Sequence, residues 1–187
     1  MAKRMAKEKQ VKLAIVIPTY NEEKVIHEVI RGLPKKLPGV SKIFVIVVDD
    51  GSTDNSADKI AKTRAILVSH PLNLGTGSAT ITGLETAKKL KADAVVTFDG
   101  DGQHDPDDIA AVIGPILEGR ADVVVGTRLK KPHGMPYPRI IGNKVLNFAT
   151  YLLSGYWTSD SQSGFKGLSK RALKKLELSS PGFEYCS

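Results

Sequence analysis

The fold is decided by the stretch AVVTFDGDGQH, which occupies Ala94–His104. Its first part is short, continuous and apolar, as is typical of a strand buried on both faces of a sheet. Its second part brings two carboxylates, Asp99 and Asp101, and the carboxamide of Gln103 to the expected carboxyl end of that strand. The glycines between them let a ligand approach the backbone closely. Taken alone, the stretch fits both a cation site and a plain acidic turn.

Further apolar runs of the same kind are spread over the first 126 residues, with helical patterns between them. The runs are Leu13–Ile17, Lys42–Val48, Ala65–Val68 and Ala121–Gly126. Helices are expected from Glu22 to Leu33, from Ser56 to Thr63 and from Gly77 to Leu90. A further helix is expected after Asp105, with Asp105 as its N-cap and Pro106 at its first position. Wholly apolar strands alternating with helices predict an α/β fold with a mainly parallel central sheet and helices on both faces.

Polar residues follow four of the expected strands, at Pro18–Glu22, Asp49–Ser52, Asp99–Gln103 and Thr127–Arg128. In parallel sheets ligands bind beyond the carboxyl ends of the strands, so we expect these segments to converge. Carboxylate and carboxamide oxygens suit Mg²⁺ or Mn²⁺, which commonly hold phosphate oxygens as well. The sequence therefore predicts a divalent metal site that holds a diphosphate.

The chain changes character after residue 128. Three prolines make Lys130–Arg139 a loop, the apolar segment Ile140–Leu153 is expected to be helical, and a short helix is expected from Ser169 to Leu176. We therefore divide the chain into a basic tail at residues 1–12, a first part at 13–128 and a second part of the same domain at 129–187.

Charge follows this division. Residues 1–12 carry a net +4, residues 13–126 a net −4 and residues 127–187 a net +7. A basic segment can meet nucleic acid, an anionic lipid surface or a phosphorylated substrate, but no nucleic-acid recognition motif accompanies it. The single cysteine, Cys186, excludes an internal disulfide, and no apolar run approaches the ~20 residues needed to span a bilayer. No N-terminal segment resembles a secretory signal.

A glycine pattern at Gly75–Thr80 offers a second hypothesis, because it partly matches the dinucleotide-binding fingerprint. Thr80 stands where the third glycine belongs, and the preceding strand is expected to end several residues too early. The same glycines can place backbone N–H groups against a phosphate or allow close helix packing. An NAD-binding module is therefore the weaker interpretation.

Five motifs occur here in the order in which family 2 glycosyltransferases carry them. They are VIPTYNE at Val16–Glu22, VDDGSTD at Val48–Asp54, NLG at Asn73–Gly75, DGDGQH at Asp99–His104 and GTR at Gly126–Arg128. From about Leu13 onward the chain resembles the branch that makes dolichyl- or polyprenyl-phosphate mannose or glucose. The resemblance implies the three-layer GT-A fold of nucleotide-diphospho-sugar transferases.

The resemblance also implies roles for individual residues. It implies that Pro18, Tyr20 and Glu22 hold the nucleoside, and that Val47 and Asp49 contact the base, with Asp50 beside them. It implies that Asp99, Asp101 and Gln103 bind the metal, with Gly100 between the two aspartates. Arg128 is expected to contact the sugar or the diphosphate. Asp160–Lys166 is similar to the family's acceptor-side motif. Thr76 departs from the pattern, since relatives often carry Lys or another long polar residue there.

The implied activity is an inverting, Mg²⁺- or Mn²⁺-dependent transfer of a hexose from a GDP-mannose or UDP-glucose type of donor to a polyprenyl or dolichyl phosphate. It would take place at the cytoplasmic face of a membrane, with peripheral contact to its anionic surface. Arg128 and Asp160 are the expected catalytic residues, Asp160 as the base if the acceptor is a hydroxyl. Two alternatives stay open: a hydroxyl acceptor in polysaccharide or glycolipid synthesis, and a nucleotide-sugar-binding domain without turnover. Relatives continue beyond the equivalent of Ser187, so we expect an incomplete acceptor side.

Overall fold

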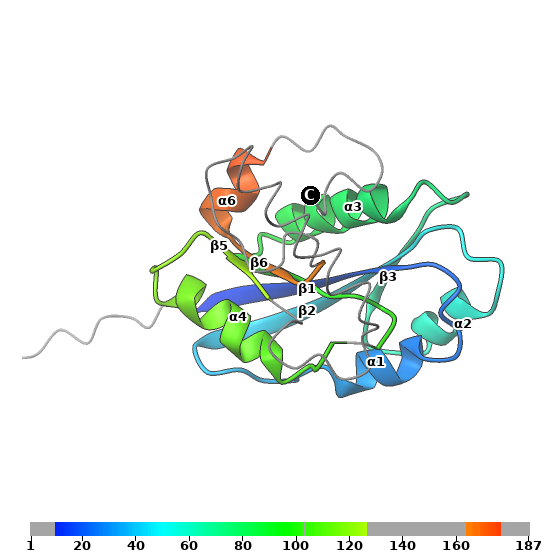
Figure 1. Cartoon of the computed structure of the whole chain (residues 1–187), viewed down its shortest axis with the longest axis horizontal. Helices are drawn as coiled ribbons and strands as arrows, with labels where there is room; N and C mark the ends of the chain where they lie inside the picture. Colours follow the sequence, from blue (N-terminus) through cyan, green and yellow to red (C-terminus); the bar gives the residue numbers. More distant parts are fainter. Residues whose placement is uncertain (1–9, 103, 127–163, 177–187) are drawn as a thin grey trace, which may run out of the picture.

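The computed structural model describes residues 10–102, 104–126 and 164–176. These residues form a six-stranded sheet in the order β3-β2-β1-β4-β6-β5, with helices on both faces (Figure 1). The strands are β1 (Val11–Thr19), β2 (Val40–Asp49), β3 (Ile66–Ser69), β4 (Ala94–Thr97), β5 (Val123–Val125) and β6 (Lys166–Ser169). The expected α/β fold is therefore confirmed.

The first four strands run in parallel, with β1 between β2 and β4. Val16 of β1 is opposite Ile46 on one side and Thr97 on the other. This register brings the carboxyl ends of β1, β2 and β4 to one edge of the sheet. β1 also begins at Val11, so Val11 and Lys12 belong to the sheet and not to the basic tail.

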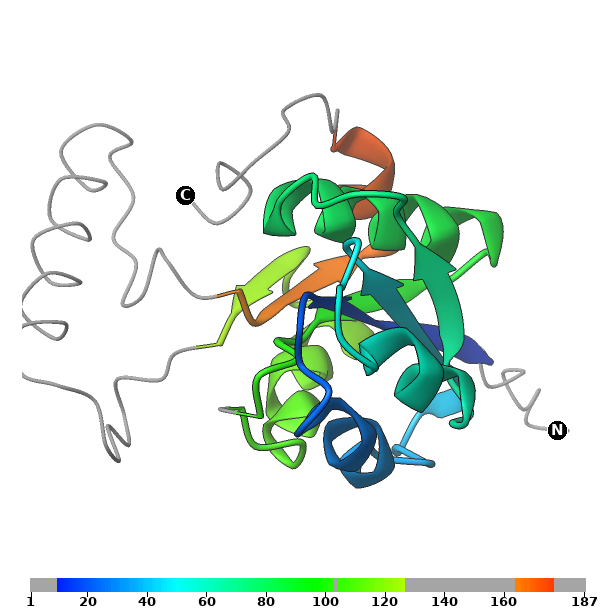
Figure 2. The same cartoon turned by 90° about the vertical axis from the view of Figure 1, so that its right-hand side faces the viewer.

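Two hydrophobic cores lie on the two faces of the sheet. Helices α1 (Ile26–Gly32), α2 (Ser56–Ala61) and α4 (Asp108–Leu117) cover one face, and α3 (Thr76–Lys89) and α6 (Lys170–Lys175) cover the other, as Figure 2 shows from the side. Strand β1 serves both cores, because Ile15 and Ile17 face the first and Ala14 and Val16 the second. This alternation explains why its sequence is apolar throughout.

Two helices begin later than expected. Helix α1 starts at Ile26 rather than Glu22. Ahead of it, the N–H groups of Glu22 and Glu23 bind Ser56 Oγ and Asp54 Oδ2 at 2.9 and 3.1 Å, and the Val25 N–H closes a turn on the Glu22 carbonyl at 3.1 Å. Helix α4 starts at Asp108, so the expected cap by Asp105 and first position for Pro106 are wrong. Asp105 instead accepts the N–H of Asp107 at 3.0 Å in a turn ahead of the helix.

Strand β6 was not expected from the sequence. It lies antiparallel between β4 and β5 and is the strand through which β5 joins the sheet in the described part of the chain. Its sequence, KGLS, is short and contains Gly167, and glycine weakens a strand. The expected helix after it is confirmed as α6, whose N-cap Ser169 accepts the N–H of Ala172 at 3.1 Å.

Candidate active site

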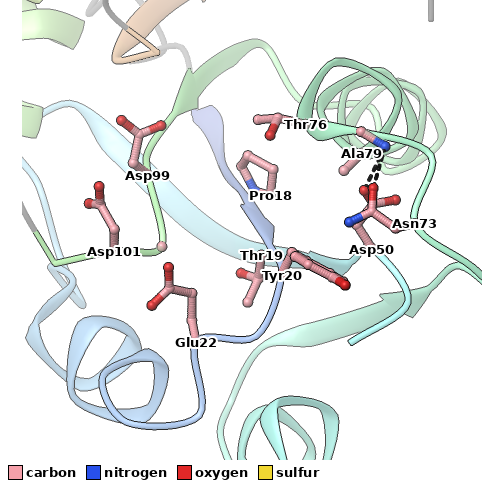
Figure 3. A pocket seen from close by; sticks show the side chains of 12 residues that line it. Pro18, Thr19, Tyr20, Glu22, Asp50, Asn73, Thr76, Ala79, Asp99 and Asp101 are labelled. Atoms are coloured by element: carbon pink, nitrogen blue, oxygen red, sulfur yellow. Dashed lines mark hydrogen bonds between the residues drawn. The ribbon is translucent and has the colours of Figure 1, made fainter. Parts of the chain in front are cut away.

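A cavity of about 390 Å³ opens at the carboxyl ends of β1, β2 and β4. Its lining residues are Pro18, Thr19, Tyr20, Glu22, Asp50, Asn73, Gly75, Thr76, Ala79, Asp99, Gly100 and Asp101 (Figure 3). Three of the four polar segments expected to converge do so here, and the fourth, Thr127–Arg128, lies outside the described residues. The volume is in the range of small-molecule sites.

The wall formed by the ends of β1 and β4 is acidic. Figure 3 shows the carboxylates of Asp99, Asp101 and Glu22 on the same side of the cavity. The pKa of Glu22 is raised, first by burial and then by the negative charges of Asp101 and Asp54. Carboxylates that repel one another in this way are stabilised by a cation between or beside them.

The donor set fits a divalent metal that is shared with a substrate. Among the described residues, no group of three or more His, Cys, Asp or Glu side chains is arranged to enclose an ion. Mg²⁺ and Mn²⁺ sites in nucleotide enzymes instead use one or two carboxylates and take the remaining ligands from phosphate oxygens and water. Asp99 and Asp101, side by side on a cavity wall, meet that requirement. The expected further ligand, Gln103, lies outside the described residues.

Glu22 gives the acidic wall a measurable pH dependence. Because the pKa of Glu22 is raised, the folded, metal-free protein binds a proton at this carboxyl more tightly than the unfolded chain does. The free energy of unfolding therefore decreases as the pH rises from the pKa of Glu22 in the unfolded chain through its pKa in the folded protein. We expect Glu22→Gln to be more stable than the wild type at pH 7 without metal, and the difference to vanish at about pH 4. Urea denaturation at both pH values measures this. Added Mg²⁺ should shrink the gap at pH 7, and a gap unchanged by Mg²⁺ would contradict a cation beside Glu22.

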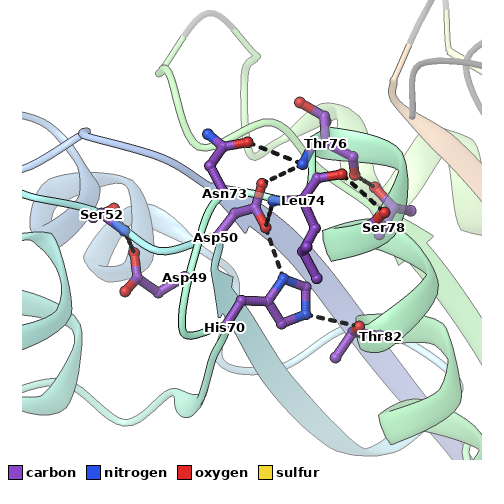
Figure 4. A network of polar contacts seen from close by, with 11 residues as sticks. Asp49, Asp50, Ser52, His70, Asn73, Leu74, Thr76, Ser78 and Thr82 are labelled. Atoms are coloured by element: carbon purple, nitrogen blue, oxygen red, sulfur yellow. Dashed lines mark hydrogen bonds and ion pairs between the residues drawn. The ribbon is translucent and has the colours of Figure 1, made fainter. Parts of the chain in front are cut away.

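The opposite wall is organised by Asp50, whose side chain is buried. Figure 4 shows its carboxylate at the centre of a polar network. It accepts the N–H groups of Leu74 and Gly75 at 3.1 and 2.8 Å, and the Nδ1–H of His70 at 2.7 Å. His70 Nε2 in turn lies 2.9 Å from Thr82 Oγ1 on α3. Asp50 therefore fixes the loop that carries Asn73 and Gly75 to the cavity.

Replacing Asp50 by Asn should loosen this loop. The amide presents one acceptor oxygen and one donor group to three donors, so the part-buried Leu74 N–H or the His70 Nδ1–H loses its acceptor, while the Gly75 N–H keeps Asn73 Oδ1 at 3.0 Å. We expect a loss of about 2–3 kcal/mol in the free energy of unfolding and faster hydrogen exchange at the Leu74 and Gly75 amides. Asp58→Asn, at an exposed position of α2, is the control. Unchanged exchange at Leu74 and Gly75 in Asp50→Asn would contradict the network.

Two residues expected to meet the base, Val47 and Asp49, do not line the cavity. Val47 is fully buried in the first core, between β1 and β3. Asp49 is buried at the end of β2, where its Oδ1 accepts the N–H of Ser52 at 3.4 Å. Their contact with a base stays a prediction.

Several lining residues were missed or given no role from the sequence. Thr76 and Ala79 belong to the first turn of α3, which therefore faces the cavity with its N-terminal end. Thr19 also lines it, and its hydroxyl is buried without a hydrogen-bond partner among the described residues. Gly75 and Gly77 at the start of α3 were the available signal, because a glycine-rich helix start can present N–H groups to a phosphate.

His104, whose role the sequence left undefined, is buried beside the acidic wall. Its Nε2 lies 2.9 Å from Asp99 Oδ2, and its ring packs against both Phe98 and Phe165. The two expected catalytic residues, Arg128 and Asp160, lie outside the described residues.

The family model described as Glycosyl transferase family 2 matches residues 14–177. The chain belongs to this family. The resemblance stated from the five motifs is thereby confirmed, and so is the expectation of a glycosyltransferase.

Two similar proteins carry names that place them in the dolichyl- or polyprenyl-phosphate branch of the family. The UDP-N-acetylglucosamine–dolichyl-phosphate N-acetylglucosaminyltransferase of Methanococcus voltae is 43% identical over 92% of this chain and 76% of its own length. The polyprenol monophosphomannose synthase of Mycolicibacterium smegmatis is 27% identical over 88% of this chain and 64% of its own length.

The GT-A fold expected for a family 2 glycosyltransferase is also confirmed. Glucosyl-3-phosphoglycerate synthase from Mycobacterium tuberculosis, solved with Mn²⁺, UDP and phosphoglyceric acid, superposes with a TM-score of 0.71 at 23% identity. The match covers 92% of this chain and 60% of that one. Within the described part of this chain, no helix has the length and apolar character that a membrane crossing requires.

Proposed function

We propose that this family 2 glycosyltransferase moves a sugar from a nucleoside-diphosphate donor to a dolichyl or polyprenyl phosphate, with a divalent metal and with inversion at the anomeric carbon. The observation that carries the proposal is the cavity at the strand ends, with two carboxylates on one wall and a helix N-terminus on the other. The similarity to a dolichyl-phosphate transferase over most of both chains supports the acceptor class.

The two walls of the cavity suit the two ends of such a donor. Tyr20 is partly exposed at the rim and offers its ring to the nucleoside, beside Pro18. The first turn of α3 directs backbone N–H groups and the positive end of the helix dipole toward the cavity, which favours a diphosphate. Thr76 has a short side chain where relatives often carry a long polar one. Contacts to the diphosphate at this position would therefore come from backbone N–H groups.

Asp99 and Asp101 would hold Mg²⁺ or Mn²⁺ against the diphosphate. When bound, the metal stabilises the negative charge that grows on the leaving diphosphate. Arg128, on the segment that follows β5, is proposed to add a second positive charge. Glu22 would stay ionised beside the cation and help to orient the donor.

The acceptor forms the new bond through a phosphate oxygen to the anomeric carbon, while the bond from that carbon to the donor diphosphate breaks. A lipid phosphate is already anionic, so the step needs no general base. A hydroxyl acceptor would have to lose a proton, and Asp160 is the proposed base for that alternative. The net +7 of residues 127–187 favours an anionic acceptor at the cytoplasmic face of a membrane with anionic lipids.

The test begins with donor binding. The protein is titrated by calorimetry with UDP-N-acetylglucosamine, UDP-glucose and GDP-mannose, each with and without Mn²⁺. The acetylglucosamine donor is included because the name of the Methanococcus voltae relative contains it. We expect metal-dependent binding of one donor, and absence of metal-dependent binding to all three would overturn the proposal.

The acceptor class is decided by transfer assays with the donor that binds. We expect transfer to a short polyprenyl phosphate and none to a polyprenol or a sugar hydroxyl. Transfer to the hydroxyl acceptor alone would favour the polysaccharide or glycolipid alternative. Donor binding with no transfer to any acceptor would favour a nucleotide-sugar-binding domain without turnover.

A further inference from the structure

We propose that His104 is a positioning residue for Asp99, that the absence of a side chain at Gly164 leaves the space this orientation requires, and that the two together set the orientation of the Asp99 carboxylate for a metal ion. The inference rests on the metal role of Asp99 in the proposed function. It adds two residues that lie 60 positions apart in the sequence, neither of which lines the cavity.

His104 holds one oxygen of the carboxylate. Its Nε2 is 2.9 Å from Asp99 Oδ2, and an ionised carboxylate only accepts, so the imidazole donates from Nε2. The His104 side chain is 4% exposed whereas that of Asp99 is 24% exposed. The donor is thus fixed in the interior while the acceptor reaches the cavity wall.

Aromatic packing fixes the plane of the imidazole. The ring centroid of His104 lies 5.5 Å from that of Phe98 and 4.9 Å from that of Phe165. Phe98 and Phe165 also meet edge to face at 5.6 Å. The three rings thus form one close-packed triangle, so a rotation of His104 that takes its Nε2–H away from Asp99 would disturb both phenyl rings.

Gly164 leaves the space that the other oxygen occupies. A Cβ built on Gly164 would lie 2.5 Å from Asp99 Oδ1 and 3.3 Å from its Cγ and Oδ2, so any side chain there would force Asp99 to move. The backbone of this segment is itself held, because the Thr97 hydroxyl donates to the Gly164 carbonyl at 2.5 Å and accepts the Lys166 N–H at 3.1 Å. Gly164 therefore cannot retreat to make room.

His104 holds Asp99 by a hydrogen bond, and Gly164 leaves room for its carboxylate by having no side chain. Groups that orient a metal-binding side chain typically change metal affinity by about 10–100-fold when they are replaced. Gly164 also belongs to the segment Asp160–Lys166, which the family resemblance places on the acceptor side. A shift of Gly164 would therefore change the space available to the Asp99 carboxylate.

The experiment uses four variants of the chain. His104→Phe keeps an aromatic ring in the cluster and removes the donor, while His104→Gln keeps a donor. Gly164→Ala adds the excluded methyl group, and Gly114→Ala is its control, because a Cβ there meets nothing within 4 Å. Two readouts are compared, the Asp99 rotamer in metal-free crystals and the affinity for Mn²⁺ alone, measured from the electron paramagnetic resonance signal of the free ion. Thermal unfolding verifies that every variant is folded.

We expect Asp99 to change rotamer in His104→Phe and in Gly164→Ala, with Mn²⁺ bound about 10-fold more weakly or worse. His104→Gln should restore most of the affinity, and Gly114→Ala should match the wild type. An unchanged rotamer and unchanged Mn²⁺ affinity in folded His104→Phe would overturn the inference. If the wild type itself binds no Mn²⁺, the metal role in the proposed function fails, and the crystal rotamers alone decide the positioning claim.

Discussion

Asp101→Ala should abolish sugar transfer while leaving the fold intact. The Asp101 carboxylate lines the cavity and raises the pKa of Glu22 by its charge, so it contributes repulsion, which its removal relieves. Without it a cation loses one of two carboxylates, and the leaving diphosphate loses its main source of stabilisation. We expect kcat/KM to fall by about 10²–10³-fold or more, with Tm within a few degrees of the wild type. Transfer assays with Mn²⁺ and the preferred donor measure the first, and calorimetry the second.

The matched control is Asp107→Asn, which removes an exposed carboxylate a few residues further along the same acidic segment. Asp107 is the N-cap residue of α4 but makes no side-chain capping hydrogen bond, so little stability depends on it. We expect nearly wild-type transfer and donor binding. Equal activity in Asp101→Ala and Asp107→Asn would rule out a metal role for Asp101.

Gly51→Ala should produce the largest loss of stability. Gly51 has φ +71°, a region that side chains rarely adopt, and a Cβ there would lie 2.5 Å from the carbonyl carbon of Leu72 and 2.8 Å from the nitrogen of Asn73. The clash is with backbone that a rotamer change cannot move. We expect about 3 kcal/mol lost, from the strained φ and the displaced loop together, and a Tm lower by about 10 °C. Scanning calorimetry and urea denaturation measure both.

Gly119→Ala separates the two contributions to that loss. Gly119 also has φ +71°, but a Cβ there meets nothing within 4 Å, so this variant carries the strain without the clash. We expect it to lose only about 1 kcal/mol. Donor affinity should fall in Gly51→Ala alone, because the displaced loop carries Asn73 to the cavity. Similar losses of stability and affinity in both variants would contradict the close contact between the two loops.

Strands and helices with strong local patterns could be predicted from the sequence. The apolar runs of β1 to β5 and the polar residues at their ends depend on neighbours in sequence, and they sufficed to locate the acidic wall at Asp99 and Asp101. The starts of α1 and α4 could not be predicted in the same way. For α1, the residues just ahead of the helix bind Asp54 and Ser56, which lie about thirty residues further along the chain.

The roles of single site residues were harder to predict because they depend on long-range contacts. The His104 ring packs against Phe165, and the Asp99 carboxylate lies next to Gly164. The residues of each pair are more than sixty positions apart in the sequence. In the sequence Asp50 is one of several polar residues at the end of a strand. In the structure its hydrogen-bond partners are a histidine and two backbone N–H groups that follow β3. Only the folded chain shows that it supports the cavity wall.

The antiparallel strand β6 also determines when the site can form during protein synthesis. β4 and the acidic turn leave the ribosome early, but β6 and Gly164 follow more than sixty residues later. Until then β4 has one open edge, Thr97 lacks Lys166 as a partner, and β5 is not joined to the sheet within the described part of the chain. A nascent chain that ended at residue 128 would therefore contain Asp99 and Asp101 but not the segment that completes their surroundings. The surroundings of Asp99 and Asp101 can therefore be complete only after residues 164–169 have been synthesised.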